Sequence, residues 1–281
     1  MEKSLMPGLG KIFLASLLAL AGGWIDRSDA LAQSIHPVVD VNEHCLIGGV
    51  ARGKWLEAEE LAPLIKGGER YRLYTLKGAT GEVVTGSAVP AEEDCNGAKE
   101  VKFSPEVREG IAVGGDWNAL PRVPRVMGTN DPVYRRAVAR ILNRQGFKKP
   151  MVNITQVLRV DLDGDGREEV LVSANYLAEG LSVNGGPMAV HATPGDYLLV
   201  FVRKIVGGKV RDIPLVEGYY PQKNSDYWTP QQAVVAAVLD LNGDGRMEII
   251  IRGGYYEGSW SSVFRLDGAK VENVFGCGCG A

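Results

Sequence analysis

The sequence contains little histidine: only His36, His44 and His191 occur among its 281 residues. None of them lies in an HExxH zinc motif, and no serine lies in a GxSxG nucleophile elbow. No glycine-rich phosphate loop follows a strand-like run. Because hydrolases need an activated nucleophile or a metal with an open position, these absences argue against the common hydrolytic mechanisms. We therefore assign no catalytic residue.

A strong charge imbalance is also absent, with 31 basic and 34 acidic residues and a net charge of -3. Nothing in this balance indicates nucleic acid as a partner. The apolar run at residues 12–21 is too short to cross a bilayer, and no second long run follows it. It lies after Lys3 and Lys11 and before Ala30-Leu31-Ala32. This order predicts a secretory signal peptide at residues 1–32, a secreted or periplasmic protein, and no transmembrane segment after signal removal.

Cysteine is scarce as well, with only Cys45, Cys95, Cys277 and Cys279. An even number in an exported protein favours two disulfides, for which three pairings exist. We expect Cys45 to pair with Cys95 around the N-terminal region, because that bridge closes a loop of about 50 residues. Cys277 would then pair with Cys279. The alternative for these last two cysteines is a soft-metal site.

Two acidic loops are the most informative feature that is present. Residues 161–169 read DLDGDGREE and residues 240–248 read DLNGDGRME, so oxygen-bearing side chains recur at every second position before a glycine. Calcium binds six to eight oxygens, and glycine at position 6 permits the turn such a loop needs. An EF-hand would require glutamate at position 12, where Val172 and Ile251 stand instead. A carboxylate occurs at position 9, and β-rich apolar residues follow, so these loops are expected to join strands.

This loop resembles the calcium loop of the integrin-like FG-GAP, or VCBS, repeat family, which reads D-x-[DN]-x-D-G-x-x-[DE] between two strands of a propeller blade. The family's Phe-Gly…Gly-Ala-Pro signature is not found. The resemblance implies two Ca²⁺ sites, with side-chain ligands and one carbonyl in each loop. The implied ligands are Asp161, Asp163, Asp165, Glu169 and the Arg167 carbonyl in the first loop, and Asp240, Asn242, Asp244, Glu248 and the Arg246 carbonyl in the second. The alternatives are solvated Asp-Gly turns without an ion, or magnesium.

The two loops align at an offset of 79 residues, and strand-like pairs joined by Gly207-Gly208 and Asp267-Gly268 follow them. Each unit therefore reads as four strands, and two units are too few to close a propeller. We expect a mainly β fold, α+β overall, with both FG-GAP-like units packed as two sheets in a compact domain at residues 151–281. A small β-rich region at 33–115 precedes it, followed by a linker and an amphipathic helix at 116–150. Asp131, Pro132 and Gly146 mark the start and stop of that helix.

Aromatic residues gather near the second loop and provide the candidate partner-binding surface. Rigid aromatic side chains on a β surface bind sugars or peptides with little loss of entropy. The sequence therefore favours a binding or scaffolding module for an unknown protein or glycan, in which calcium is structural. The alternative is an exported hydrolase that uses carboxylates such as Glu257 or Asp226. The candidate aromatic residues are Tyr219, Tyr220, Tyr255, Tyr256 and Trp260.

Overall fold

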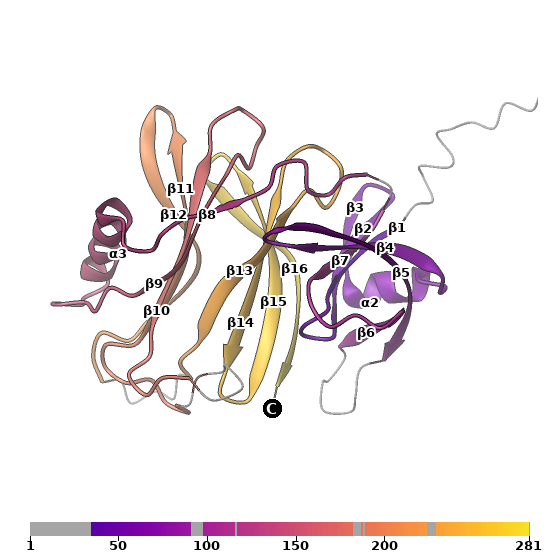
Figure 1. The fold of residues 1–281 in the computed structure, drawn as a ribbon. Coiled ribbons are helices and arrows are strands. Elements are labelled where there is room, and N and C mark those ends of the chain that lie inside the picture. The colour runs from indigo at the N-terminus through magenta and orange to yellow at the C-terminus, as the bar shows by residue number, and fades with distance from the viewer. Residues whose placement is uncertain are drawn as a thin grey trace, which may run out of the picture.

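The computed structural model describes residues 35–90, 98–115, 117–181, 187, 189–223 and 229–280. The predicted signal peptide at 1–32, Cys95 and Asp226 lie outside these residues. The fold is mainly β, as expected, and consists of three antiparallel sheets with short helices (Figure 1). Within the described residues, no helix has the length and apolar character needed to cross a bilayer.

The N-terminal region forms a seven-stranded sheet with the order β3-β2-β1-β7-β4-β5-β6. A short helix, α2 (Ala58–Leu61), and a 3-10 turn, Ala62–Leu64, follow its third strand. Its strands are β1 (Ile35–Asp40), β2 (Cys45–Ala51), β3 (Lys54–Glu57), β4 (Glu69–Thr75), β5 (Gly78–Pro90), β6 (Lys99–Ser104) and β7 (Ile111–Gly114).

Both repeat units form the four antiparallel strands that the sequence predicts. The first sheet contains β9 (Ile154–Val160), β10 (Glu169–Tyr176), β11 (Tyr197–Val206) and β12 (Lys209–Tyr219). The second contains β13 (Gln232–Leu239), β14 (Glu248–Tyr255), β15 (Gly258–Asp267) and β16 (Lys270–Gly280). The acidic loops join β9 to β10 and β13 to β14, so they connect strands rather than helices. The linker adds a fifth strand, β8 (Arg125–Val126), to the edge of the first sheet.

The amphipathic helix α3 (Pro132–Arg144) begins where the sequence places its cap. The Asp131 carboxylate accepts a 2.7 Å hydrogen bond from the Val133 backbone N–H. Proline is well suited to the first helical turn because its missing N–H has no partner there in any case. Gly146 follows the helix with a φ of 93°, a conformation that glycine adopts without strain.

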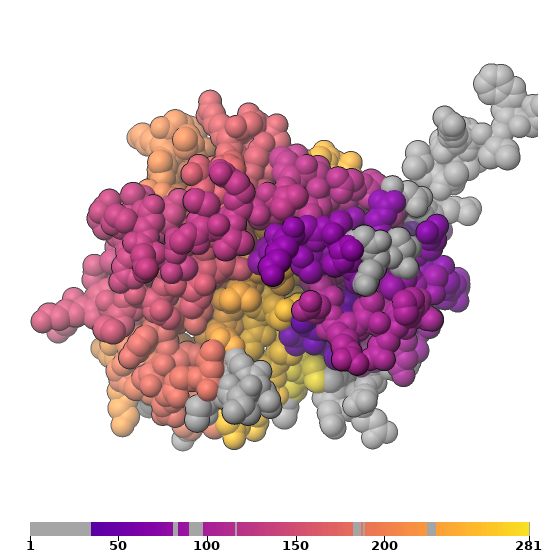
Figure 2. Space-filling model, in the orientation of Figure 1, coloured from indigo at the N-terminus to yellow at the C-terminus, as the bar shows by residue number. Residues whose placement is uncertain are grey.

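Because successive side chains of a strand point to opposite faces, each sheet contributes to the core on both sides. Figure 1 shows the layers that these faces separate. Val170 and Val172 of β10 pack toward α3, whereas Leu171 faces the four-stranded sheet. In the seven-stranded sheet, Val38 joins that central core while its neighbour Val39 packs on the other side. The order of layers is therefore α3, the first repeat sheet, the second repeat sheet and the N-terminal sheet. Figure 2 shows the N-terminal residues packed directly against the orange and yellow C-terminal ones.

A buried ion pair ties the N-terminal sheet to the second repeat sheet. The Asp40 side chain is fully buried at the end of β1, and its Oδ2 accepts a 2.8 Å hydrogen bond from Arg252 Nε on β14. Arg252 Nη2 donates to the other carboxylate oxygen, and the Ser261 hydroxyl donates to Oδ2 at 2.7 Å. A buried carboxylate is tolerated when charge and hydrogen bonds compensate it in this way.

The disulfides correct the expected cysteine pairing. Cys45 is bonded to Cys277, with 6.4 Å between their Cα atoms, instead of to Cys95. The expected Cys277–Cys279 bridge is therefore wrong as well. Cys279 is also disulfide-bonded, so neither Cys277 nor Cys279 provides a thiolate for a soft-metal site. The expectation failed because it weighed sequence separation alone. In the fold β16 packs beside β2, which brings together cysteines that are 232 residues apart.

Candidate metal-binding loops

The first residue of each loop organises its backbone. Both carboxylate oxygens of Asp161 accept backbone hydrogen bonds, from Gly164 N–H at 2.7 Å and Gly166 N–H at 3.0 Å. Asp240 does the same with Gly243 N–H at 2.7 Å and Gly245 N–H at 2.9 Å. All four glycines have φ between 75° and 83°, which other residues adopt only with strain. The repeated sequence thus produces a repeated loop conformation.

The carboxylate at position 9 closes each loop from the following strand. Glu169 Oε2 accepts a 2.9 Å hydrogen bond from Leu162 N–H, and Glu248 Oε2 accepts one of the same length from Leu241 N–H. Both glutamates are buried, at 4% and 0% exposure. Burial raises the pKa of both carboxyls, and it raises that of Glu248 to about 8. Each loop therefore holds a carboxyl group in surroundings that disfavour its ionised form.

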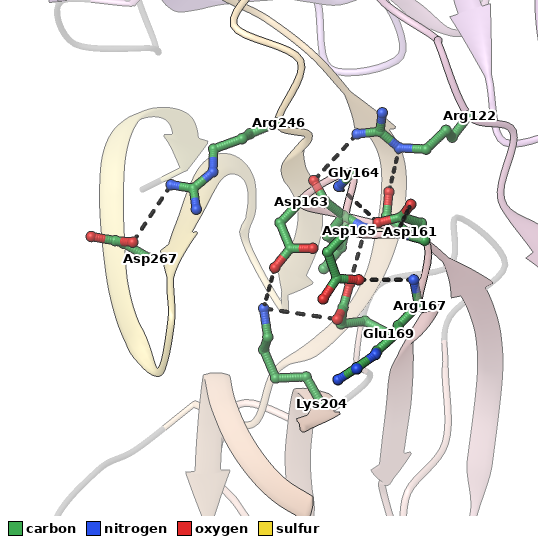
Figure 3. A network of polar contacts seen from close by, with 12 residues as sticks. Arg122, Asp161, Asp163, Gly164, Asp165, Arg167, Glu169, Lys204, Arg246 and Asp267 are labelled. Atoms are coloured by element: carbon green, nitrogen blue, oxygen red, sulfur yellow. Dashed lines mark hydrogen bonds and ion pairs between the residues drawn. The ribbon is translucent and has the colours of Figure 1, made fainter. Parts of the chain in front are cut away.

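The two loops lie side by side, and the linker spans them. Met247 N–H donates to the Leu162 carbonyl at 2.8 Å, which joins the loops directly. Arg122 Nε donates to the Asp161 carbonyl, and its Nη2 donates to the Gly245 carbonyl at 2.6 Å (Figure 3). Trp117 Nε1 donates to the Asp240 carbonyl at 2.7 Å. These contacts make the linker part of the loop structure.

Replacing Arg122 by alanine is expected to destabilise the protein by about 2 kcal/mol, because the guanidinium donates charge-assisted hydrogen bonds to carbonyls of both loops. Arg122→Lys should recover only part of this loss, since a single ammonium lacks the planar fork that reaches two carbonyls. Urea unfolding of the three proteins measures the difference. Equal midpoints and slopes for all three would show that the bridge contributes nothing to stability.

The first loop brings together three of its predicted ligands. Single carboxylate oxygens of Asp161, Asp163 and Glu169 lie within 4.8 Å of one another. A lysine that the sequence did not indicate enters this group: Lys204 Nζ of β11 lies 3.0 Å from Asp163 Oδ2 and 3.8 Å from Glu169 Oε1. Burial alone would raise the pKa of Asp163, but the hydrogen bond and charge of Lys204 bring it below its ordinary value. An ammonium group thus already neutralises part of this loop.

Among the described residues, no lysine or arginine pairs with the carboxylates of the second loop. Glu248 Oε1 is buried and has no hydrogen-bond partner, although Asp240 and Asp244 are close enough to raise the pKa of this carboxyl further. Burial raises the pKa of Asp240 too. Buried polar atoms are almost always paired, and a retained proton or a bound cation would relieve this unpaired oxygen beside two other carboxylates. The first loop also has a buried oxygen without a partner, Asp163 Oδ1. The residues of the second loop fit a hard divalent ion, which prefers oxygen ligands.

The remaining predicted ligands stabilise the loop turns. Asp165 Oδ1 accepts a hydrogen bond from Arg167 N–H, and Asp244 Oδ1 accepts one from Arg246 N–H, each at 2.8 Å. In the second loop Asn242 Nδ2 also donates to Asp244 Oδ2 at 2.9 Å. The guanidinium of Arg246 points away from the loop toward Asp267 (Figure 3).

The aromatic candidates lie at the end of β12 and on the hairpin formed by β14 and β15. Tyr219 packs edge-on against Phe147 beyond the end of α3, with 6.4 Å between ring centroids, and lines a hollow of about 450 Å³ together with Tyr220. Trp260 donates to Gln231 Oε1 at 3.1 Å and is partly buried. A Cβ atom on Gly258 would lie only 2.4 Å from the Tyr255 ring, so that ring packs on its own hairpin. Tyr256 is 49% exposed.

Of the two carboxylates named for the hydrolase alternative, the structure describes only Glu257. Glu257 is exposed in the turn between β14 and β15. Asp226 lies outside the described residues.

No protein-family model, no curated protein and no solved structure matches this chain. The resemblance to FG-GAP repeats therefore rests on the two loops and their four-stranded units.

Proposed function

We propose that the protein is an exported, calcium-stabilised β protein that acts as a binding or scaffolding module. The observation that carries the calcium assignment is the second loop, where Glu248 Oε1 is buried without a partner next to Asp240 and Asp244. A bound divalent cation would provide the missing partner and would favour the ionised carboxylates. The ion would join the two strands that flank the loop, so its role is structural rather than catalytic.

Export is supported by the disulfide between Cys45 and Cys277, because such bonds persist in oxidising compartments.

Binding of a glycan or peptide is supported by the hollow beside Tyr219 and Tyr220. Its wall also contains the amide side chains of Gln222 and Gln231 and the Glu217 carboxylate. Aromatic rings beside such polar groups match the mixed character of a sugar or a peptide.

Calcium is expected to raise the stability of the purified mature protein. If the ion binds with an affinity near 10⁻⁴ M, a millimolar concentration adds about 1.4 kcal/mol for the second loop. For a chain of this size that corresponds to about 3–6 °C in melting temperature. Thermal melts in metal-free buffer, with CaCl₂ and with MgCl₂ measure the effect. A melting temperature that calcium leaves unchanged would refute the structural role of the ion.

The partner class is tested by a glycan and peptide array probed with calcium and in metal-free buffer. Binding to one ligand class that Tyr220→Ala abolishes would place the contact in the hollow, and Tyr256→Ala is the matched control on another hairpin. A ligand retained equally by both variants would locate the binding face elsewhere.

A further inference from the structure

Lys204 is a buried cation inside the first loop (Figure 3). It extends from β11, is 8% exposed, and approaches the carboxylates of Asp163 and Glu169 at 3.0 and 3.8 Å. A buried ammonium is costly unless carboxylates compensate its charge, and the same holds for the carboxylates. The lysine therefore compensates part of the negative charge of the loop without any ion.

The ammonium also occupies the side of the loop that an ion would need. It faces Glu169 Oε1, while the other oxygen of this carboxylate accepts the Leu162 backbone hydrogen bond. In the second loop the corresponding oxygen, Glu248 Oε1, has no hydrogen-bond partner. The two loops share the backbone hydrogen bonds to their first aspartate and to the closing glutamate, and they differ at this glutamate oxygen. The first loop has its own buried oxygen without a partner, Asp163 Oδ1, on the carboxylate that bonds Lys204 through its other oxygen.

In the second unit the residue that corresponds to Lys204 does not enter the loop. Val170 of β10 pairs with Arg203 of β11, and the corresponding Ile249 of β14 pairs with Phe264 of β15. The next residue of the third strand is therefore Lys204 in the first sheet and Arg265 in the second. Arg265 is directed to Glu272, at 2.8 Å, and is about one-third exposed. The carboxylate that bonds Lys204, Asp163, is replaced by Asn242 in the second loop. At the predicted ligand positions the first loop thus has one extra carboxylate, Asp163, and it is matched by one extra buried cation, Lys204.

We propose that Lys204 is the built-in counter-ion of the first loop, so that the two loops are functionally unequal. The second loop binds Ca²⁺ tightly, and the first is held by lysine and admits an ion only when the ammonium is removed. This inference rests on the proposed calcium function. It corrects the equivalence that two nearly identical nine-residue motifs suggest.

Calcium stoichiometry, measured by isothermal titration and equilibrium dialysis with CaCl₂, tests the proposal. The wild-type protein should bind one tight equivalent, and Glu248→Gln should bind none. Lys204→Met keeps most of the side-chain stem and removes the charge, so it should bind two equivalents. The affinity of the first loop should rise at least about tenfold, because a unit charge next to the ligands has been removed. Lys209→Met, which removes an exposed lysine at the start of β12, is the matched control and should bind one equivalent.

The number of calcium ions bound by each variant tests the role of Lys204 separately from calcium binding itself. Two equal sites in the wild-type protein, or one tight site remaining in Glu248→Gln, would overturn the role of Lys204 while calcium binding stands. A single site in a folded Lys204→Met protein would overturn it as well. Absence of calcium binding from the wild-type protein would refute the proposed function. Because wild type and Glu248→Gln already decide between one and two sites, the test holds even if Lys204→Met fails to fold.

Discussion

Arg252→Ala should be among the most destabilising single substitutions in this protein, with a loss of about 3–5 kcal/mol in unfolding free energy. The alanine leaves the Asp40 carboxylate fully buried, with the Ser261 hydroxyl and the Asn42 backbone N–H as its remaining donors. The cost comes from an uncompensated buried charge more than from the lost attraction. Urea unfolding at neutral pH measures it.

Arg125→Ala is the matched control, because Arg125 forms an ion pair with Glu168 at 2.6 Å while its side chain is 60% exposed. Exposed pairs contribute less than about 1 kcal/mol, since water screens them. A double-mutant cycle that combines Arg252→Met with Asp40→Asn would isolate the coupling between the two side chains. If Arg252→Ala were no more destabilising than Arg125→Ala, the buried pair would not hold the N-terminal sheet against the repeat sheets.

The stability of the metal-free protein is expected to fall as the pH rises from about 5 to about 8. Burial raises the pKa of Glu248 from 4.5 to about 8, so within this window the folded protein retains a proton that the unfolded chain has lost. Unfolding free energy then decreases with pH, by up to about 4 kcal/mol across the window. The raised pKa of Asp240 acts in the same direction at its lower end.

Calcium should flatten this decline, because the cation stabilises the ionised form of Glu248. Denaturant unfolding at several pH values, in metal-free buffer and in CaCl₂, makes the comparison. Glu248→Gln removes the titrating group and should flatten the metal-free profile without added ion. Parallel profiles in the two buffers would show that the buried carboxyl and the ion do not interact.

Local sequence was sufficient to predict the loops, the strands on either side of them and the capped helix. These features depend on residues within a few positions of each other, such as Asp161 with Gly164 or Asp131 with Val133. The turn glycines of the hairpins are equally local. The mainly β fold and the four-stranded repeat units were therefore predictable from spacing alone.

The side chains that reach the two loops from elsewhere in the chain could not be predicted in this way. Lys204 lies 41 residues from Asp163, and Arg122 lies 123 residues from Gly245. Only the packing of sheets and linker brings these groups together. The same reason explains the incorrect disulfide pairing, because β2 and β16 become neighbours through tertiary structure. The sequence located the two acidic loops and gave no indication of the side chains that surround them.

The bond between Cys45 and Cys277 also constrains the order of assembly. The ribosome delivers the N-terminal sheet first, yet its covalent partner follows 232 residues later. Early strands must therefore remain unlinked while most of the polypeptide is still being made, and closure of such a distant contact is slow. An oxidant that acts on the nascent polypeptide would meet Cys45 before its correct partner exists, which makes disulfide isomerisation the step most in need of catalysis during production of this protein.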